Sequence, residues 1–324
     1  MHTYLEAQKR RCDIQFLRFR PSRSISKTFS IAALSLFTFC IALQLYINGL
    51  REASTPAAVD GHESPYNTTM TEVETAPPVP KQLTGAVVVP ASRIAELEWV
   101  SEIQDPMWKL HRYNYDDPSP PPETHFPVNK GQEAMMYLSY VINNYDSLPD
   151  YSIFLHGHRT SWHQEEDIVE SINSLRLSAV DDVGYISLRC IWDPGCPEEM
   201  KLIENDPAEL VVDSTKDRQN TMHLIGKSWK SLFGNNTATP KAIGAPCCAQ
   251  FMATRKAIHI RSKAEYERMR QWLVDTEVVD HLSGMLFEKL WAYIFTKEAI
   301  RCPSEEQCKC GYFGRCASEP AIPG

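Results

Sequence analysis

Three histidines, an arginine and a tryptophan fall within the eight residues 156–163, HGHRTSWH. His156 and His158 alternate, so in an extended backbone their imidazoles can reach one centre and hold a divalent metal ion. The same stretch could instead bind a diphosphate, with Arg159 as a bidentate donor and one of the histidines as a proton donor. A third interpretation is a polar loop whose histidines hydrogen-bond to the backbone. The first two interpretations make this loop the leading candidate site.

The elements around this loop are predicted to alternate between strands and helices. Residues 86–90, 108–113 and 150–156 are typical of strands, and the first is a continuous apolar run, as expected for a strand buried on both faces. Apolar residues recur at helical spacing across 94–100 and across 134–145. Strands that alternate with helices predict an α/β domain with a mostly parallel βαβ sheet.

Further candidate residues follow the predicted strands, where sheets of this kind bind their ligands. Asp116 and Asp117 come after the second strand, and a solvated turn is the alternative interpretation for this pair. Asn129 and Gly131 precede the next helix, whose first amides could hold an anion. Asn129 could equally be a helix cap, whereas Gly131 costs helix stability and so indicates a close backbone approach.

The C-terminal half carries a second group of candidates. Residues 244–255, GAPCCAQFMATR, are typical of a loop that enters a short strand, and apolar stripes across 266–273 and 286–294 predict two helices. Glu288 lies beside the second stripe, one turn before its tryptophan. Its carboxylate could be a general base that faces a pocket or a buried partner of Arg255.

The N-terminus predicts a membrane anchor. Residues 1–27 hold seven basic and two acidic side chains, a net charge of +5, and an uncharged apolar run then begins at Thr28 and ends at Ile47. A helix of this length can cross the hydrocarbon core. A cleavable signal peptide and a buried core helix are the alternatives, but the basic region is long and no small-residue cleavage site follows the run. The charge bias places the tail in the cytosol and the rest in the lumen, as in a type II protein.

The composition of the chain after residue 47 predicts a stalk, a folded body and a cysteine-rich tail. Residues 48–85 contain five prolines and no apolar periodicity, so we expect a disordered luminal stalk. The α/β body should span residues 86–300, and a cysteine-rich tail residues 301–324. Asn67 and Asn235 each begin an Asn-x-Thr sequence, the acceptor pattern for glycosylation.

Overall charge limits the classes of partner. The 324 residues carry a formal net charge of −8, with 43% hydrophobic and 23% charged residues, values that exclude a fibrous, wholly disordered or polytopic membrane chain. Because the tail is basic, the part after residue 27 is still more acidic than the whole. An acidic body is a poor surface for phosphate contacts, so we expect no nucleic-acid binding.

Eight of the ten cysteines lie in the predicted luminal body and tail. An even number in an oxidising compartment favours disulfides. The alternative is a zinc site, but the tail spacing C-x5-C-x-C-x5-C lacks the paired C-x2-C pattern of that class. The sequence does not determine the pairing. The eight are Cys190, Cys196, Cys247, Cys248, Cys302, Cys308, Cys310 and Cys316.

Three segments carry a resemblance to a known family. Residues 129–158, 244–255 and 283–295 resemble an uncharacterised family of fungal membrane-anchored proteins, catalogued as a domain of unknown function, and the similarity covers nearly all of 85–295. More distantly, the order of elements is similar to that of nucleotide-sugar glycosyltransferases of the GT-A type. Those enzymes have an N-terminal βαβ nucleotide-binding half and often a single Golgi signal-anchor with a stalk.

The GT-A resemblance implies where ligands would bind. Asp116 and Asp117, or the strand end at residues 156–158, would lie near the nucleotide, and Glu288 near the acceptor. The Asp-x-Asp metal pair that those enzymes usually carry after the central strand is replaced here by His156, Gly157 and His158.

Three functional hypotheses follow. The first is a luminal GT-A-like glycosyltransferase that uses a nucleotide-sugar donor, with Glu288 or His163 to activate the acceptor hydroxyl. The second is a histidine-metal oxidase or another tailoring enzyme of fungal natural-product biosynthesis, with a metal on His156, His158 and His163. The third is a non-catalytic membrane scaffold. Each predicts a single-pass protein of the Golgi or endoplasmic reticulum with its body in the lumen.

Overall fold

The structure is a computed structural model, and it describes residues 82–161, 164–197 and 199–316. The predicted cytosolic tail, the apolar run, nearly all of the stalk, Asn67 and His163 lie outside the described residues. Within the described ranges, no helix has both the length and the apolar character that a membrane crossing requires. The described residues thus comprise the predicted body and most of the adjoining cysteine-rich segment.

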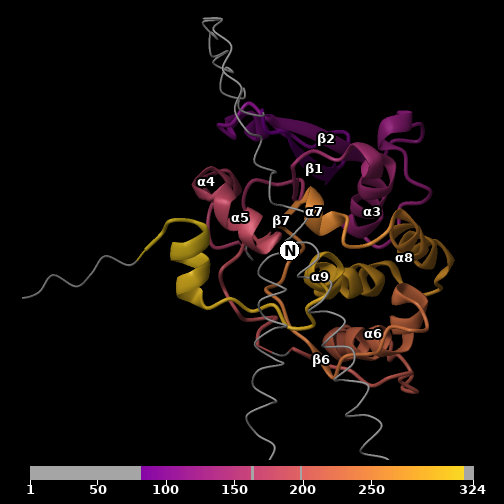
Figure 1. The fold of residues 1–324 in the computed structure, drawn as a ribbon. Coiled ribbons are helices and arrows are strands. Elements are labelled where there is room, and N and C mark those ends of the chain that lie inside the picture. The colour runs from indigo at the N-terminus through magenta and orange to yellow at the C-terminus, as the bar shows by residue number, and fades with distance from the viewer. Residues whose placement is uncertain (1–81, 162–163, 198, 317–324) are drawn as a thin grey trace, which may run out of the picture. The chain divides into compact units, whose positions relative to one another are not determined.

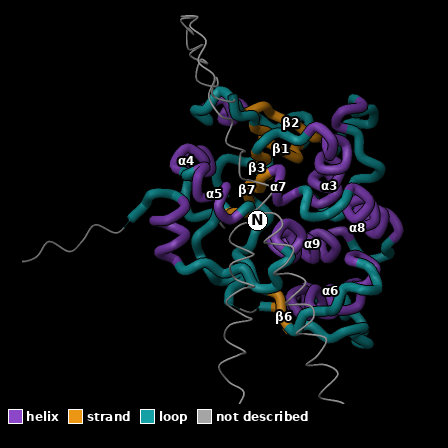
Figure 2. Tube along the Cα trace, viewed as in Figure 1, coloured by secondary structure: helices purple, strands orange, loops and turns teal. Residues whose placement is uncertain are grey.

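A five-stranded mixed sheet forms the centre of this body (Figures 1 and 2). Its spatial order is β2-β1-β3-β7-β4, which places β3 in the middle. β1 is parallel to β2 and to β3, whereas β7 is antiparallel to both β3 and β4. The strands are β1 Gly85–Ala91, β2 Trp108–Asn114, β3 Tyr151–Phe154, β4 Tyr185–Ser187 and β7 Phe251–Thr254. The prediction of an α/β domain is confirmed, and the sheet is mixed because β7 runs against its neighbours.

Alternate residues of β1 face two separate cores. Ala86 and Val88 pack with helices α3, α6, α8 and α9 on one face, and Val87 and Val89 pack with α4 and α5 on the other. Burial on both faces explains the unbroken apolar run of this strand. Figure 1 shows the two groups of helices on opposite sides of the sheet. Their bounds are α3 Glu133–Asn144, α4 Ile168–Ser174, α5 Leu177–Val183, α6 Asp217–Phe233, α8 Lys263–Asp275 and α9 Asp280–Thr296.

The connection between β1 and β2 differs from the prediction. The helical spacing across residues 94–100 yields only the 3-10 turn η1, Glu98–Glu102. Ile94 is 90% exposed, so it takes no part in an apolar face. The predicted helices across 134–145, 266–273 and 286–294 are all present as α3, α8 and α9.

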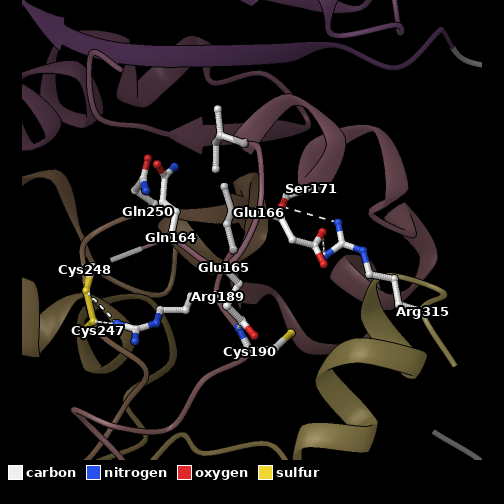
Figure 3. Close-up of a pocket in the computed structure, with 12 residues that line it drawn as sticks. Gln164, Glu165, Glu166, Ser171, Arg189, Cys190, Cys247, Cys248, Gln250 and Arg315 are labelled. Carbon is white, nitrogen blue, oxygen red and sulfur yellow. Dashed lines mark hydrogen bonds and ion pairs between the residues drawn. A yellow bond between two sulfur atoms is a disulfide. The ribbon is translucent and has the colours of Figure 1, made fainter. Parts of the chain in front are cut away.

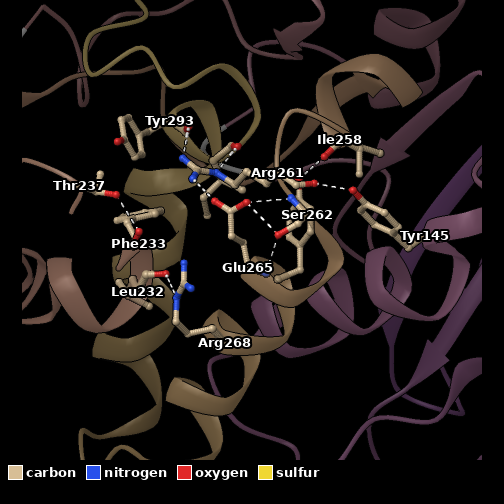
Figure 4. Close-up of polar contacts among 12 residues, drawn as sticks. Tyr145, Leu232, Phe233, Thr237, Ile258, Arg261, Ser262, Glu265, Arg268 and Tyr293 are labelled. Atoms are coloured by element: carbon tan, nitrogen blue, oxygen red, sulfur yellow. Dashed lines mark hydrogen bonds and ion pairs between the residues drawn. The ribbon is translucent and has the colours of Figure 1, made fainter. Parts of the chain in front are cut away.

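Arg261 joins α8 to the end of α9 (Figure 4). Its guanidinium donates to the carbonyl of Ile294 at 2.8 Å and to that of Tyr293 at 3.2 Å, and it also reaches Glu265 at 3.2 Å. Carbonyls at the end of a helix have no partner within the helix, and a cation there is favoured by the helix dipole. Ser262 and Glu265 form a capping box that begins α8 directly after the arginine.

All eight cysteines of the described residues are paired in disulfides, as the sequence predicts. The pairs are Cys190–Cys308, Cys196–Cys302, Cys247–Cys248 and Cys310–Cys316. The first two join the loop after β4 to the C-terminal segment over sequence separations of 118 and 106 residues. The cysteine-rich segment, which includes the helical turn η5 Gln307–Tyr312, is therefore bound to the α/β body.

The remaining strands and the remaining α-helix are short. β5 Met200–Lys201 and β6 Ala242–Ile243 form a separate antiparallel pair. The short helix α7 Arg255–Ile258 follows β7 directly.

Candidate functional site

Five chain segments meet at one edge of the central sheet. Ala91 at the end of β1 pairs with Asn114 at the end of β2, and Phe154 at the end of β3 pairs with Phe251 at the start of β7. Because β7 is antiparallel, its start lies beside the carboxyl ends of the parallel strands. The loops that leave β1, β2, β3 and β4 and the loop that enters β7 are thus neighbours.

An open cleft of about 420 Å³ lies at this edge. This volume is within the range of small-molecule sites. Its wall comes from the ends of β1, β2 and β3 and from the start of α3, and it contains no lysine or arginine. The lining residues are Pro90, Ala91, Ser92, Ala95, Tyr115, Asn129, Gln132, Glu133, Met136, His156, Gly157 and His158.

The two histidines of the loop after β3 line this cleft. Their ring centroids are 5.3 Å apart, and the backbone N–H of His156 donates to Gln250 Oε1 at 3.2 Å. Partial burial lowers the pKa of His158, which favours its neutral form near pH 7. A neutral imidazole can accept a proton or bind a metal.

Gly157 fixes this loop against β1. A Cβ at Gly157 would lie 2.9 Å from the carbonyl oxygen of Pro90 and 3.1 Å from Cβ of Ala91. The absence of a side chain lets the two strand ends approach each other. That approach places both histidines at the wall of the cleft.

Glu133 is the first residue of α3 and the carboxylate of the cleft wall. Burial raises its pKa to about 8, and the negative charges of Glu288 and Asp280 contribute to the increase. Such a group can gain and lose a proton near neutral pH, as general acid–base catalysis requires. The sequence analysis missed Glu133, because an acidic residue in the first turn of a helix also has an ordinary dipole role.

The described domain matches a known family. The family described as "Protein of unknown function (DUF3431)" covers residues 87–311. The chain belongs to this family. No curated protein and no solved structure matches the chain. The matched range of the DUF3431 domain extends past residue 300 into the cysteine-rich segment, in agreement with the disulfides that bind this segment to the body.

Of the two candidate residues before α3 in the DUF3431 domain, Asn129 lines the cleft and Gly131 does not. The Nδ2 of Asn129 donates to the carbonyl of Tyr115 at 3.3 Å. Gly131 makes the close approach that the sequence predicts, but it approaches another part of the protein and not a ligand. A Cβ at this position would lie 2.6 Å from the side chain of Leu273. Its backbone N–H donates to Asp280 Oδ1 at 2.6 Å, so a carboxylate of the domain holds this amide.

The carboxylates of Asp116 and Asp117 accept hydrogen bonds from the backbone of loops. Asp116 Oδ1 accepts the backbone N–H of Arg93 at 2.7 Å, which joins the loop after β2 to the loop after β1. Asp117 Oδ1 accepts the N–H of Ser119 at 3.0 Å. Neither carboxylate is in the cleft wall, although Tyr115 beside them is.

Arg159 also lies outside the cleft wall. Its guanidinium donates to Asp167 and, at 2.8 Å, to Glu102, and these hydrogen bonds raise the pKa of Arg159. Asp167 in turn caps α4. Arg159 therefore anchors the histidine loop to α4 and η1, and a phosphate would have to displace two carboxylates to use it.

Glu288 has a different ionic partner from the one considered in the sequence. Lys289 Nζ lies 3.0 Å from Glu288 Oε1 and 3.2 Å from Glu199 Oε2, and its side chain is only 7% exposed. Arg255 pairs with Asp150 at 3.3 Å. The role of Glu288 as a base remains a prediction, and its effect on Glu133 places it near the cleft.

One group of potential metal ligands lies outside the cleft wall, and two of its members are joined in a disulfide. In the part of the chain that the structure describes, the one group of three histidine, cysteine or acidic donors within 4.8 Å of one another is Cys247, Cys248 and Glu288. The disulfide of this group lines a separate cavity of about 20 Å³, and Figure 3 shows Arg189 pointing at its sulfur atoms. A metal on His156 and His158 would thus need further ligands from elsewhere, such as substrate oxygens.

Proposed function

We propose that the DUF3431 domain is a GT-A-like glycosyltransferase whose cleft binds a nucleotide-sugar donor. The observation that carries the proposal is the cleft of about 420 Å³ at the carboxyl ends of β1, β2 and β3, with Glu133, His156 and His158 in its wall. Open α/β sheets bind ligands at this position. The order of elements in the sequence is the basis of the GT-A resemblance, whereas the histidine pair after the central strand departs from it, since it stands where those enzymes usually carry an Asp-x-Asp pair.

Glu133 has the properties of an acid–base group for this reaction. Transfer of a sugar to a hydroxyl acceptor requires removal of the hydroxyl proton. A carboxylate with a pKa of about 8 is a stronger base than an ordinary glutamate and is still partly ionised near neutral pH. Glu133 would accept this proton, and Glu288 would set the local charge around it.

The diphosphate leaving group needs compensation of its charge. The cleft wall offers no lysine or arginine, and Arg159 is held by Asp167 and Glu102. His156 and His158 can donate hydrogen bonds to phosphate oxygens, or they can hold a divalent metal together with those oxygens. We infer that donor binding depends on this histidine pair.

We further propose that the protein is a single-pass type II membrane protein of the fungal secretory pathway. Four disulfides support this location, because disulfides persist in oxidising compartments. The basic tail and the uncharged run of the sequence support the orientation. Asn235 is exposed, as a glycosylated asparagine must be.

Titration of the purified protein with UDP, GDP and ADP, each with and without Mn²⁺, tests donor binding. We expect at least one nucleoside diphosphate to bind, and we expect His158→Ala to weaken its binding about tenfold or more, the loss of one good polar interaction. His259→Ala is the matched control. His259 lies beside Asp150, Arg255 and Tyr151, at the opposite edge of the sheet, and its removal should leave binding unchanged.

Glu133→Gln separates binding from chemistry. The variant keeps the shape of the side chain, so the nucleotide should still bind, while transfer or hydrolysis of the matching nucleotide sugar should fall about a hundredfold or more. Absence of nucleotide binding under all of these conditions would refute the glycosyltransferase proposal. One tightly bound redox metal per chain that depends on His156 would instead support the oxidase hypothesis, and absence of both would support a scaffold.

A further inference from the structure

The disulfide between Cys247 and Cys248 cannot be explained by chain stabilisation. A disulfide stabilises a fold chiefly by closing a long loop in the unfolded chain. Cys190–Cys308 closes a separation of 118 residues, whereas Cys247 and Cys248 are adjacent in the sequence. A bond between neighbours removes almost no freedom from the unfolded chain, so this pair calls for another explanation.

The backbone at this pair is unusual as well. Cys248 has φ 96° and Ala249 has φ 52°, two consecutive non-glycine residues in a region that L-residues avoid. Such outliers concentrate at functional sites. The segment leads directly to Gln250, which accepts the backbone N–H of His156. Cys248 is therefore linked to the histidine loop through Gln250, two residues later in the chain.

Charged groups surround the two sulfur atoms (Figure 3). The guanidinium of Arg189 donates to Sγ of Cys247 and, at 3.2 Å, to Sγ of Cys248. A cation beside a cysteine stabilises the thiolate form. A carboxylate oxygen of Glu288 lies within 4.8 Å of both sulfur atoms. Cys247 is buried, but Cys248 is partly exposed, so a small reductant can reach the pair.

We propose that Cys247 and Cys248, once reduced, form with Glu288 a binding site for a thiophilic divalent cation such as Zn²⁺. A dithiol reductant transfers two electrons and two protons to the disulfide and is itself oxidised to a disulfide. The two protein thiols then release their protons when the cation binds. Thiolates are the ligands that select such metals.

The net charge of the site is the same before reduction of the disulfide and after binding of the cation. The disulfide is neutral, and two thiolates with one divalent cation also sum to zero. Arg189, Glu288 and Lys289 therefore experience the same net charge in the oxidised and in the metal-bound form. The reduced form without metal keeps its two thiol protons, because two thiolates beside Glu288 would repel one another, and a bound cation compensates the charge of the thiolates once these protons leave.

A fourth ligand position is available. The cavity of about 20 Å³ touches Cys247, Cys248 and Gln250, and this volume suffices for one water molecule. Three protein ligands with one water are the arrangement of catalytic zinc sites. The inference does not depend on the nucleotide-sugar proposal, since it concerns metal binding alone.

Cobalt substitution tests the site in the full chain. The protein is treated with dithiothreitol, excess reductant is removed, and the thiols are located by alkylation and mass spectrometry. We expect Cys247 and Cys248 to be reduced in the folded protein. Addition of Co²⁺ should then give the near-ultraviolet absorption of cobalt–thiolate bonds at one ion per chain, and Zn²⁺ should displace it.

Variants assign the ligands. Replacement of both Cys247 and Cys248 by serine should abolish the absorption, and Glu288→Gln should weaken Co²⁺ binding about tenfold or more. Replacement of both Cys310 and Cys316 by serine removes another disulfide and is the matched control, which should keep the absorption. Circular dichroism establishes that each variant is folded.

Three results would overturn the proposal. The first is a Cys247–Cys248 pair that stays oxidised until the protein unfolds. The second is a reduced pair that gives no cobalt–thiolate absorption. The third is an absorption that persists in the variant without Cys247 and Cys248.

Discussion

Glu133→Gln should stabilise the protein, and the gain should increase with pH. The pKa of Glu133 is about 8 in the folded protein, against 4.5 for an unperturbed glutamate. Between these two values the unfolded chain has lost the proton and the folded chain still holds it. The folded state therefore loses stability as pH rises through this window, and the full cost applies above about pH 8. Glutamine cannot ionise, so the variant is free of this cost.

The size of the effect follows from the same two values. One pKa unit corresponds to about 1.4 kcal/mol, so the difference between 4.5 and about 8 gives an upper limit of about 5 kcal/mol. Glu133 is partly exposed to the open cleft, where water screens its charge. We expect a gain of about 2–3 kcal/mol at pH 9 and almost none at pH 4.5. Urea denaturation of wild-type and variant protein at both pH values measures it.

An exposed glutamate provides the comparison. Glu123 lies at the surface in the 3-10 turn Pro122–Thr124 before α3, and Glu123→Gln should change the free energy of unfolding by less than about 0.5 kcal/mol at either pH. If Glu133→Gln gave the same change at pH 4.5 and at pH 9, Glu133 would not be a buried acid with a raised pKa. Its proposed role in proton transfer would then lose its physical basis.

Three further outcomes are expected. Arg261→Met should lower the free energy of unfolding by about 3–5 kcal/mol in urea denaturation, because the carbonyl of Ile294 loses its donor and Glu265 loses a buried cationic partner, whereas the exposed Arg93→Met should cost less than about 1 kcal/mol. Asn235→Gln should remove one endoglycosidase-sensitive gel shift. Protease added to sealed microsomes should leave the body intact, and digestion of the body in sealed microsomes would contradict the luminal topology. Alkylation of denatured, unreduced protein should find no free thiol among the cysteines of residues 190–316, and four or more would contradict the disulfide assignment.

Local patterns in the sequence predicted much of the fold. The apolar run of β1 and the helical stripes of α3, α8 and α9 can be recognised because strand and helix periodicity are properties of neighbouring residues. The same logic predicted the edge of the sheet at which His156 and His158 lie. It failed for residues 94–100, where Leu97 and Val100 pack against the core but Ile94 is 90% exposed, so the helical spacing does not make a continuous apolar face.

The amino-acid sequence by itself predicted the strands β1, β2 and β3 and the helices α3, α8 and α9, and its histidine loop and apolar run remain the basis of the predicted ligand site and membrane anchor. Only the tertiary structure decided which groups meet. It paired Arg159 with Glu102 and Asp167, joined the cysteines, and gave Glu133 a raised pKa beside Glu288. It also inserted β7 between β3 and β4 in the opposite direction. These outcomes depend on contacts between residues far apart in the chain, and spacing along a sequence carries no information about the distance, burial or charge of such partners.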